Sequence, residues 1–244
     1  MGGQAVRRSG GRWFRLAVGF GGAVLLTARP ADRLSAQVGY DPSRSPFRDL
    51  RRGAGLRFAT GYLGGDRGTV PVGLSDGPTF GVRFETSLGR VASFAAGFSY
   101  GRTTRFIVFP YDSAGKRTKG PFDANVVLAD LGLQLSLTGA KTFHGFLPYV
   151  GGSLGLAFGR DLPADTSGYR FGTKLTIAPG AGLRWYPARR FSVQADARAL
   201  FWKLNYPITY RDLATDGTRV LALTAPQSDW TTHSWISLGV GWTF

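Results

Sequence analysis

The chain lacks several of the residues on which catalytic and metal sites commonly depend. Its 244 residues include no cysteine and only two histidines, His144 and His233, which lie far apart in the sequence. The absence of thiols excludes cysteine catalysis, cysteine-ligated metals and disulfide bonds. Two distant histidines do not form a transition-metal cluster. We therefore expect no bound metal and no cofactor.

Charged residues are also scarce, at 18% of the chain, whereas glycine and aromatic residues are abundant, with 36 glycines, 18 phenylalanines and six tryptophans. A soluble surface normally carries about 25% charged residues. A barrel in lipid uses aromatics at its interfaces and glycines to relieve crowding in a narrow lumen. The length fits a single all-β domain.

No apolar run is long enough for a helix to cross a membrane, which takes roughly 20 residues. The apolar stretch 14–28 begins among arginines, is broken by glycines, and is followed by Leu34-Ser35-Ala36 before Gln37. This is the layout of a secretory signal peptide. We expect a cleaved signal peptide over 1–36 and a periplasmic lead-in over 37–51, with a membrane-anchor helix as the alternative.

The formal net charge is +15, and about +10 remains once the six arginines and one aspartate of the predicted signal peptide are removed. Basic proteins often bind nucleic acid, but export makes that partner unsuitable. We expect anionic outer-membrane lipids and lipopolysaccharide as partners instead. The same charge could alternatively keep a folding intermediate soluble. The residues proposed for lipid contact are Arg102, Arg105, Lys116, Arg117 and Lys119.

From residue 52 onward the sequence alternates with period 2, which predicts β-strands. Eight segments of about 10–15 residues recur, close to the 9–11 residues that a tilted membrane strand needs and longer than soluble strands, which average about 5–6. A ten-strand count would have to split the stretch 205–231. The predicted strands are 53–63, 79–88, 91–106, 125–138, 146–159, 171–186, 191–204 and 232–244, with a bulge expected at Pro179.

The predicted connections alternate between short (89–90, 139–145 and 187–190) and long (64–78, 107–124, 160–170 and 205–231). Outer-membrane barrels show this asymmetry, with short periplasmic turns and long outer loops. We therefore predict an all-β fold over 52–244, an eight-stranded antiparallel up-and-down transmembrane β-barrel. Its last strand should close against the strand that contains Leu56 and Phe58.

One row of each predicted strand is apolar, and the other carries mainly glycine, alanine and serine with a few charges. The small residues suit a tight interior, so we expect the apolar rows to face lipid. A soluble lipocalin-like barrel, with apolar rows inside, is the alternative.

The last strand ends in an alternating apolar row. This row resembles the C-terminal signature by which the barrel-assembly machinery recognises bacterial outer-membrane barrels. The predicted mature chain resembles, more loosely, small eight-stranded barrels of the OmpA/OmpX type. The resemblance implies a bacterial outer-membrane location. Unlike OmpA, the chain is expected to have no periplasmic domain after Phe244, and we favour a monomer. The row consists of Ile236, Leu238, Val240, Trp242 and Phe244.

The inward rows contain five bases and three acids, which are costly inside a narrow barrel unless they are paired. We expect an ion-pair ladder that plugs the lumen, with at least two bases left to water, carbonyls or an anion. A narrow path for anions is the alternative, since eight strands leave little free space. These residues are Arg57, Arg83, Glu85, Asp130, Lys174, Arg184, Asp196 and Arg198.

Aromatic residues fall near both ends of the apolar rows, where a membrane interface is expected. Trp185 and Trp242 lie near the predicted periplasmic ends, and Tyr100, Phe158 and Phe201 near the outer ends.

Two matches to G-x-S-x-G, at 97–101 and 151–155, fall in the middle of strands, whereas a hydrolase needs a strand-to-helix turn. We therefore expect no enzyme, but a structural or surface-contact role with a largely plugged lumen. An OmpW-like passage for small apolar or anionic solutes is one alternative, which a lateral opening near Pro179 would favour. A lipid A-modifying enzyme is another, which a Ser/His/acid cluster near His233 would favour.

Overall fold

The computed structural model describes residues 45–50 and 53–244. The predicted signal peptide and all but residues 45–50 of the predicted lead-in lie outside the described residues. Within the described residues, no helix has the length and apolar character that a membrane crossing by a helix requires.

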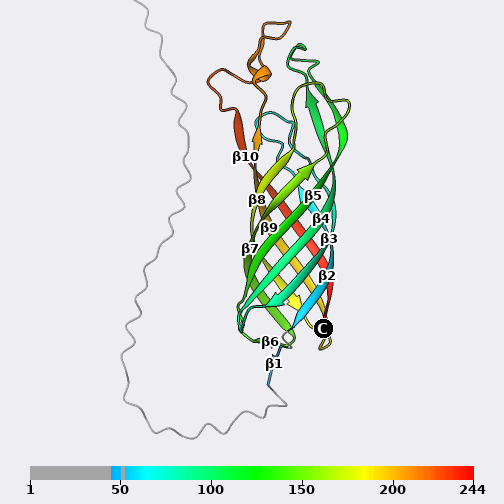
Figure 1. Cartoon of the computed structure of the whole chain (residues 1–244), viewed down its shortest axis with the longest axis vertical. Helices are drawn as coiled ribbons and strands as arrows, with labels where there is room; N and C mark the ends of the chain where they lie inside the picture. Colours follow the sequence, from blue (N-terminus) through cyan, green and yellow to red (C-terminus); the bar gives the residue numbers. More distant parts are fainter. Residues whose placement is uncertain (1–44, 51–52) are drawn as a thin grey trace, which may run out of the picture. The chain divides into compact units, whose positions relative to one another are not determined.

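Eight long strands pair in antiparallel order around a closed barrel (Figure 1). β10 pairs with β2, which joins the last long strand to the first, and β7 pairs with β8, so that every long strand has two neighbours. The predicted all-β, eight-stranded barrel is therefore confirmed. The strands are β2 (Ala54–Gly64), β3 (Gly77–Ser87), β4 (Ala92–Val108), β5 (Thr118–Ser136), β7 (Phe146–Gly159), β8 (Thr173–Trp185), β9 (Phe191–Asn205) and β10 (Ser228–Thr243).

The last strand closes the barrel as expected, with Trp242 opposite Leu56 and Val240 opposite Phe58. The chain's final residue extends this edge, because the backbone N–H of Phe244 donates to the carbonyl of Ala54 at 2.9 Å. Three connections at this end are short and four at the other end are long. We call these the short-turn end and the long-loop end.

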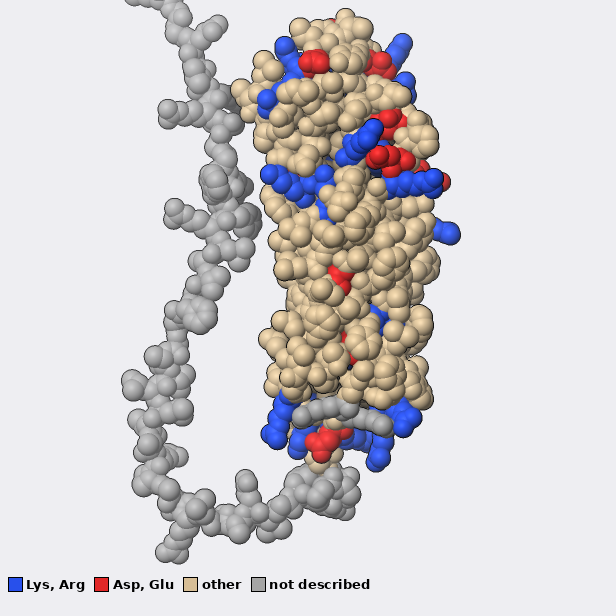
Figure 2. Space-filling view, in the orientation of Figure 1, with Lys and Arg blue, Asp and Glu red and all other residues tan. Residues whose placement is uncertain are grey.

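The apolar rows face outward, as predicted. Phe58, Leu131 and Ile236 are 61%, 59% and 63% exposed, whereas Arg57, Asp130 and Ser237 beside them are buried. In Figure 2 a band with few charged atoms separates two charged ends. Above this apolar belt the outward positions turn polar at Arg102, Asn125, Lys203 and Thr232.

Several strands run further toward the long-loop end than predicted, most of all β5 and then β10, which begins at Ser228 and not at 232. β5 begins at Thr118, not 125, and pairs with β4 up to Val108. The outward row there is Lys119, Pro121, Asp123 and Asn125, which are all exposed. This part of the hairpin has left the apolar belt, so the alternation that marks the other strands is lost there.

The bulge predicted at Pro179 is wrong. β8 and β9 keep one register on both sides of it, with Ile177 opposite Phe201 and Gly180 opposite Arg198. Proline lacks the N–H that would bond to the neighbouring strand, so the ladder lapses without gaining a residue. The register shift occurs instead in β4, between Arg105 and Ile107.

A short ribbon at the short-turn end escaped prediction. β1 (Phe47–Asp49) pairs antiparallel with β6 (Lys141–Phe143), which lies within the expected turn 139–145. The backbone N–H of Leu50 donates to Ala140, and that of His144 donates to Pro46. Three-residue strands are too short for a period to show in the sequence.

Candidate functional site: the lumen and its cap

Seven of the eight predicted lumen residues join one hydrogen-bonded and ion-paired network. Glu85 of β3 lies between two guanidinium groups. It accepts from Arg57 of β2 and, at 2.6 Å, from Arg184 of β8. β3 and β8 are not neighbours in the sheet, so the second pair crosses the lumen. The paired charges offset the cost of burying each one alone.

The network continues from Arg184 through amide and hydroxyl groups. The Arg184 guanidinium donates to Gln194 at 2.9 Å, to Gln134 at 3.1 Å and to Tyr186 at 3.2 Å. Gln194 in turn donates to Tyr149 and Asp196. These polar neutral residues lie in the inward rows. The alternation of inward and outward positions along each strand is therefore enough to predict them as partners of the charges.

Two further acids complete the network. Arg198 lies 3.4 Å from Asp196 and 3.8 Å from Asp130, and Arg83 donates to Asp130 at 2.9 Å. Tyr149 also donates to Asp196. The connected set holds four arginines and three carboxylates, close to neutrality. It contains Arg57, Arg83, Glu85, Asp130, Arg184, Asp196 and Arg198.

Lys174 stands apart from this network. It is buried toward the long-loop end of β8, with its ammonium 5.9 Å from the centre of the Phe171 ring. No carboxylate of the described chain lies within ion-pair distance of it. Lys174 is therefore one of the lumen bases that were predicted to have no acid partner.

Glycines make room for the large inward side chains. A Cβ on Gly182 would meet the Tyr149 ring at 2.4 Å and the Ala195 carbonyl at 2.6 Å, and one on Gly97 would meet Asp130 at 2.6 Å. Gly180 lies against Arg198 in the same way. The glycines and the buried polar groups are thus parts of one packing arrangement.

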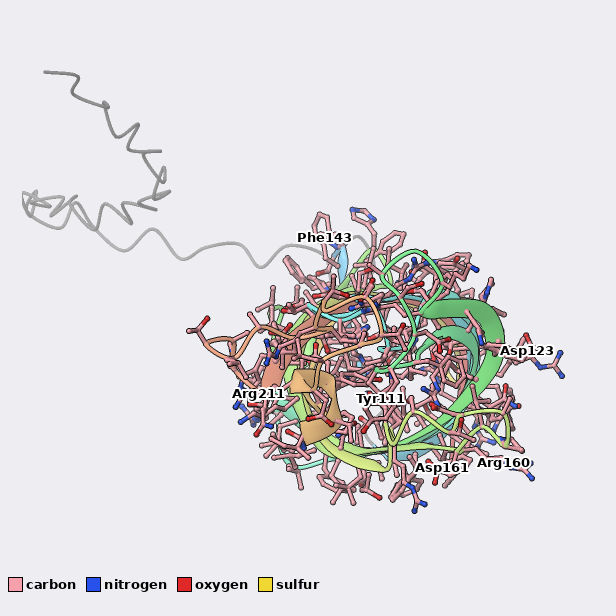
Figure 3. All side chains as sticks on the ribbon, turned by 90° about the horizontal axis from the view of Figure 1, so that it is seen from above. Tyr111, Asp123, Phe143, Arg160, Asp161 and Arg211 are labelled. Carbon is pink, nitrogen blue, oxygen red and sulfur yellow. The ribbon has the colours of Figure 1, made fainter. Side chains whose placement is uncertain are left out.

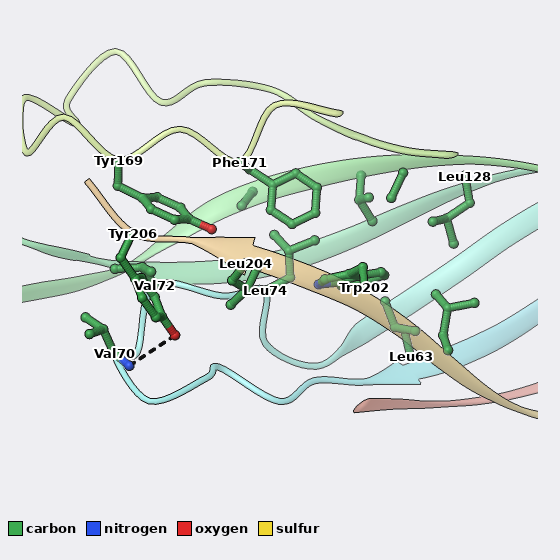
Figure 4. Close-up of a cluster of buried hydrophobic side chains, with 14 of the residues drawn as sticks. Leu63, Val70, Val72, Leu74, Leu128, Tyr169, Phe171, Trp202, Leu204 and Tyr206 are labelled. Carbon is green, nitrogen blue, oxygen red and sulfur yellow. Dashed lines mark hydrogen bonds between the residues drawn. The ribbon is translucent and has the colours of Figure 1, made fainter. Parts of the chain in front are cut away.

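Above the charged network the lumen is apolar (Figure 4). Leu63, Trp202 and Leu204 are fully buried there. The first long loop adds Val70, Val72 and Leu74 to the same cluster. The barrel is therefore polar inside where its outer surface is apolar, and apolar inside where its outer surface is polar.

His233 is buried in this upper lumen and stacks on Trp202, with ring centroids 3.9 Å apart. Its Nδ1 accepts the backbone N–H of Asp66 at 3.2 Å, so the neutral ring carries its proton on Nε2. Nε2 lies 3.0 Å from the Thr231 hydroxyl, which lies 3.3 Å from the Trp202 carbonyl. The imidazole then donates to Thr231 and cannot act as a base toward it.

The four long loops are tied together over this cluster. Thr69 of the first loop donates twice to Asp229 of β10, at 2.8 and 2.9 Å. Arg105 of β4 and Asp165 of the third loop form a buried ion pair at 2.6 Å. Viewed from above in Figure 3, side chains and loops crowd the barrel mouth. We call this assembly the cap.

The second and fourth loops are joined around Asp216, which accepts from the backbone N–H of Ala114 at 2.7 Å and from Thr218. These hydrogen bonds, led by that of the Thr218 hydroxyl, lower the pKa of Asp216 to about 2. Within the helical turn η2 (Ile208–Arg211), burial raises the pKa of Tyr210 to about 12. Both residues therefore keep their charge state near neutral pH.

The predicted interface aromatics all lie on the outward face. Phe158 and Trp185 are 39% and 43% exposed, whereas Tyr100 and Phe201 are half-buried by their outward neighbours. The predicted assembly row is exposed along β10 from Ile236 to Phe244.

Free space in the charged part of the lumen is small. Cavities of about 20, 40 and 50 Å³ border the network and the short-turn mouth. A water molecule needs about 10–15 Å³ by this kind of measure, so each holds a few waters at most. Among the described residues, no three His, Asp or Glu side chains gather as metal ligands would.

These features place the barrel in a membrane. In the closed ring each of the eight strands has a paired neighbour on both sides, as a sheet in lipid requires, and the exposed belt would aggregate in water. An even number of strands with short turns at one end and long loops at the other is the architecture of bacterial outer-membrane barrels. The chain is accordingly an outer-membrane β-barrel protein, with its short-turn end in the periplasm.

A scan against protein-family models and a search of curated proteins gave no match. Among solved structures, the chain is similar to Neisserial surface protein A, with 13% identity over 82% of this chain and 98% of that one and a TM-score of 0.49. It is similar to the outer membrane protein OprG from Pseudomonas aeruginosa, with 12% identity over 80% and 98% and a TM-score of 0.49. It is also similar to the N-terminal β-barrel domain of Pseudomonas aeruginosa OprF, with 16% identity over 79% and 98% and a TM-score of 0.43.

Proposed function

We propose that this protein is a closed, non-catalytic outer-membrane barrel that acts through contacts of its cap at the cell surface. The observation that carries the proposal is the double closure of the lumen. The charged network crosses the lower lumen, and the apolar cluster around Trp202 fills the upper lumen. A solute would have to break several buried ion pairs and displace a packed core.

The surroundings of His233 do not favour a hydrolytic role. The hydrogen bonds of His233 already occupy both of its ring nitrogens, and its partner hydroxyl is fully buried. Ser234, the nearest serine in sequence, is exposed on the opposite face of β10. An acyl-transfer enzyme needs a reachable nucleophile hydrogen-bonded to a free base, and this arrangement offers neither.

Single cysteines test the closure, because the chain has no native thiol to interfere. Ser153→Cys places a thiol in the lumen beside the 20 Å³ cavity, whereas Ser87→Cys and Ala114→Cys place it in exposed positions at the two ends. A charged, membrane-impermeant thiol reagent should label both controls and leave position 153 unlabelled. Labelling of position 153 at the rate of the controls would refute the closed lumen.

A second candidate function rests on the seam between β8 and β9. In the described part of the chain, β8 and β9 form one residue pair above Gly180, which is Ile177 opposite Phe201. A weak seam in a barrel wall could open sideways and pass a small apolar solute. Against this reading, Leu200 and Trp202 of β9 are buried and fill the wall from inside.

A disulfide across the seam separates the two functions. Leu175 and Lys203 would face each other if the register continued upward. If the barrel is closed, oxidation of Leu175→Cys/Lys203→Cys should not change the rate at which small apolar solutes cross the membrane. Loss of uptake on oxidation, restored by a reductant, would favour lateral passage.

A further inference from the structure

The periplasmic rim of the barrel carries a charge imbalance that the lumen and the cap do not explain. Among the described residues of this end, five basic side chains are exposed and Asp49 is the one exposed acidic side chain. Blue atoms gather at this lower end in Figure 2. At the long-loop end, by contrast, acids are nearly as numerous as bases, and exposed bases have acid partners, as in the pairs Lys119–Asp112 and Arg170–Asp161. The rim bases are Arg48, Arg90, Lys141, Arg189 and Arg190.

These bases border the apolar belt directly. Arg90 lies at a turn between Leu88 and Val91, which are 60% and 46% exposed. Arg190 precedes Phe191, and Lys141 is two residues from the exposed Phe143. Cations at this height, just below apolar side chains, lie where the phosphates of the periplasmic leaflet are found.

The β1–β6 ribbon extends the same pattern. Phe47 and Phe143 face each other with ring centroids 5.4 Å apart, and both are about half exposed. Phe146 stacks on Trp185 nearby, at 6.2 Å. Exposed aromatic rings next to bases are typical of surfaces that sit at a lipid interface. A groove of about 750 Å³ lies between this ribbon and the turn 186–190, and its charged lining residues are Arg48, Arg189 and the acid Asp49.

We propose that the periplasmic rim binds the phosphate headgroups of anionic phospholipids in the inner leaflet of the outer membrane. Arg48 and Arg189 hold a headgroup in the groove, and Arg90, Lys141 and Arg190 contact further headgroups around the rim. The exposed rings of the ribbon pack against the upper parts of the acyl chains. The contact fixes the depth of the barrel from the periplasmic side.

Tryptophan quenching by brominated lipids tests this contact in the refolded full barrel. The Trp230→Phe background leaves Trp185 and Trp242, both near the rim, as the exposed tryptophans among the described residues. Vesicles contain either brominated phosphatidylglycerol or brominated phosphatidylcholine at equal density. The quenching ratio of the two lipids measures the preference for the anionic headgroup. We expect a ratio above one that falls as salt is raised.

Lys141→Gln/Arg189→Gln/Arg190→Gln should lower the preference about fivefold or more. The matched control, Arg160→Gln/Arg170→Gln/Arg219→Gln, removes the same charge from exposed positions at the long-loop end and should leave the preference unchanged. An unchanged ratio in the rim variant would overturn the proposal, as would an equal fall in both variants, which would indicate net charge alone. Loss of binding to soluble peptidoglycan fragments without a change in the ratio would assign the rim to a polymer instead.

Discussion

At the scale of single residues, Glu85 is the acid on which the lower lumen most depends. It pairs with Arg57 of the neighbouring strand β2 and, across the lumen, with Arg184 of β8. Both guanidiniums are buried, so the loss of this carboxylate would leave two cations without a counter-charge. Removing one partner of a buried ion pair is far more costly than removing an exposed charge.

Glu85→Gln should therefore destabilise the barrel by about 3–5 kcal/mol. The denaturant midpoint of the folded, heat-modifiable gel band measures this loss. Asp49→Asn, which neutralises an exposed acid at the rim, should change the stability by about 0.5 kcal/mol or less. Equal midpoints for the two variants would show that the network does not stabilise the fold.

The lumen glycines give a second test at this scale. Gly182→Ala would place a methyl group against the Tyr149 ring and the Ala195 carbonyl, and should cost about 1–3 kcal/mol. Gly152→Ala is the matched control, because it adds the same methyl group to β7 with its nearest contacts at 3.9 Å. The denaturant midpoint of Gly152→Ala should match that of the wild type. A similar loss of stability in the two variants would show that crowding of Tyr149 is not the cause.

Parity in the sequence was enough to predict which ionisable residues point into the lumen. It could not predict which of them meet. Arg57 and Arg83 are opposite each other in neighbouring strands, yet each reaches a different acid. The Arg184–Glu85 pair joins strands from across the barrel, so it depends on the barrel diameter and on rotamers.

At the scale of elements, the long loops are bound to one another and do not act as independent tips. The tie between the second and fourth loops depends on the charged form of Asp216. Because the folded pKa of Asp216 is about 2, below its usual value, this tie contributes fully above about pH 4. The contribution is lost as the pH falls through 2.

We expect amide exchange at Ala114 and Thr218 to stay slow from pH 7 to 4, after correction for intrinsic rates, and to rise below pH 3. Asp216→Asn should show fast exchange at both sites already at pH 7. Slow exchange in this variant would mean that other contacts hold the two loops together.

The final strand makes an assembly prediction. Deleting Phe244 should impair insertion, because it removes a backbone hydrogen bond between the last and first strands and the last residue of the predicted C-terminal assembly row. Leu137→Ala removes an apolar side chain of similar exposure, 62% against 59%, from the same end of the barrel. It should insert normally. Normal insertion of both variants would show that the terminal residue is not needed for assembly.

Strand positions within the belt were predictable, because lipid and a narrow lumen impose opposite residue types on the two rows. Outside the belt this contrast reverses or disappears. The polar outer row of β5 above Val127 was missed for that reason, whereas the β1–β6 ribbon was missed because strands of three residues are too short to show a period. Trp202 lies in the same inward row of β9 as Gln194, but this row is polar in the lower lumen and apolar in the upper lumen.

At the scale of the whole molecule, the barrel consists of two parts with opposite polarity. The lower part has a polar interior and an apolar surface, and the upper part has an apolar interior beneath a tied cap. The ion-paired network fills the lower interior, and the apolar cluster fills the upper interior. The central claim of this account is that the barrel spans the membrane without conducting through it.

Conductance of the refolded protein in planar bilayers tests this claim most directly. The account predicts a silent bilayer over the voltage range in which a large porin, added afterwards, shows open steps. Rare, brief openings are compatible with local loosening of the network. Steady large openings of the wild-type protein would contradict the account.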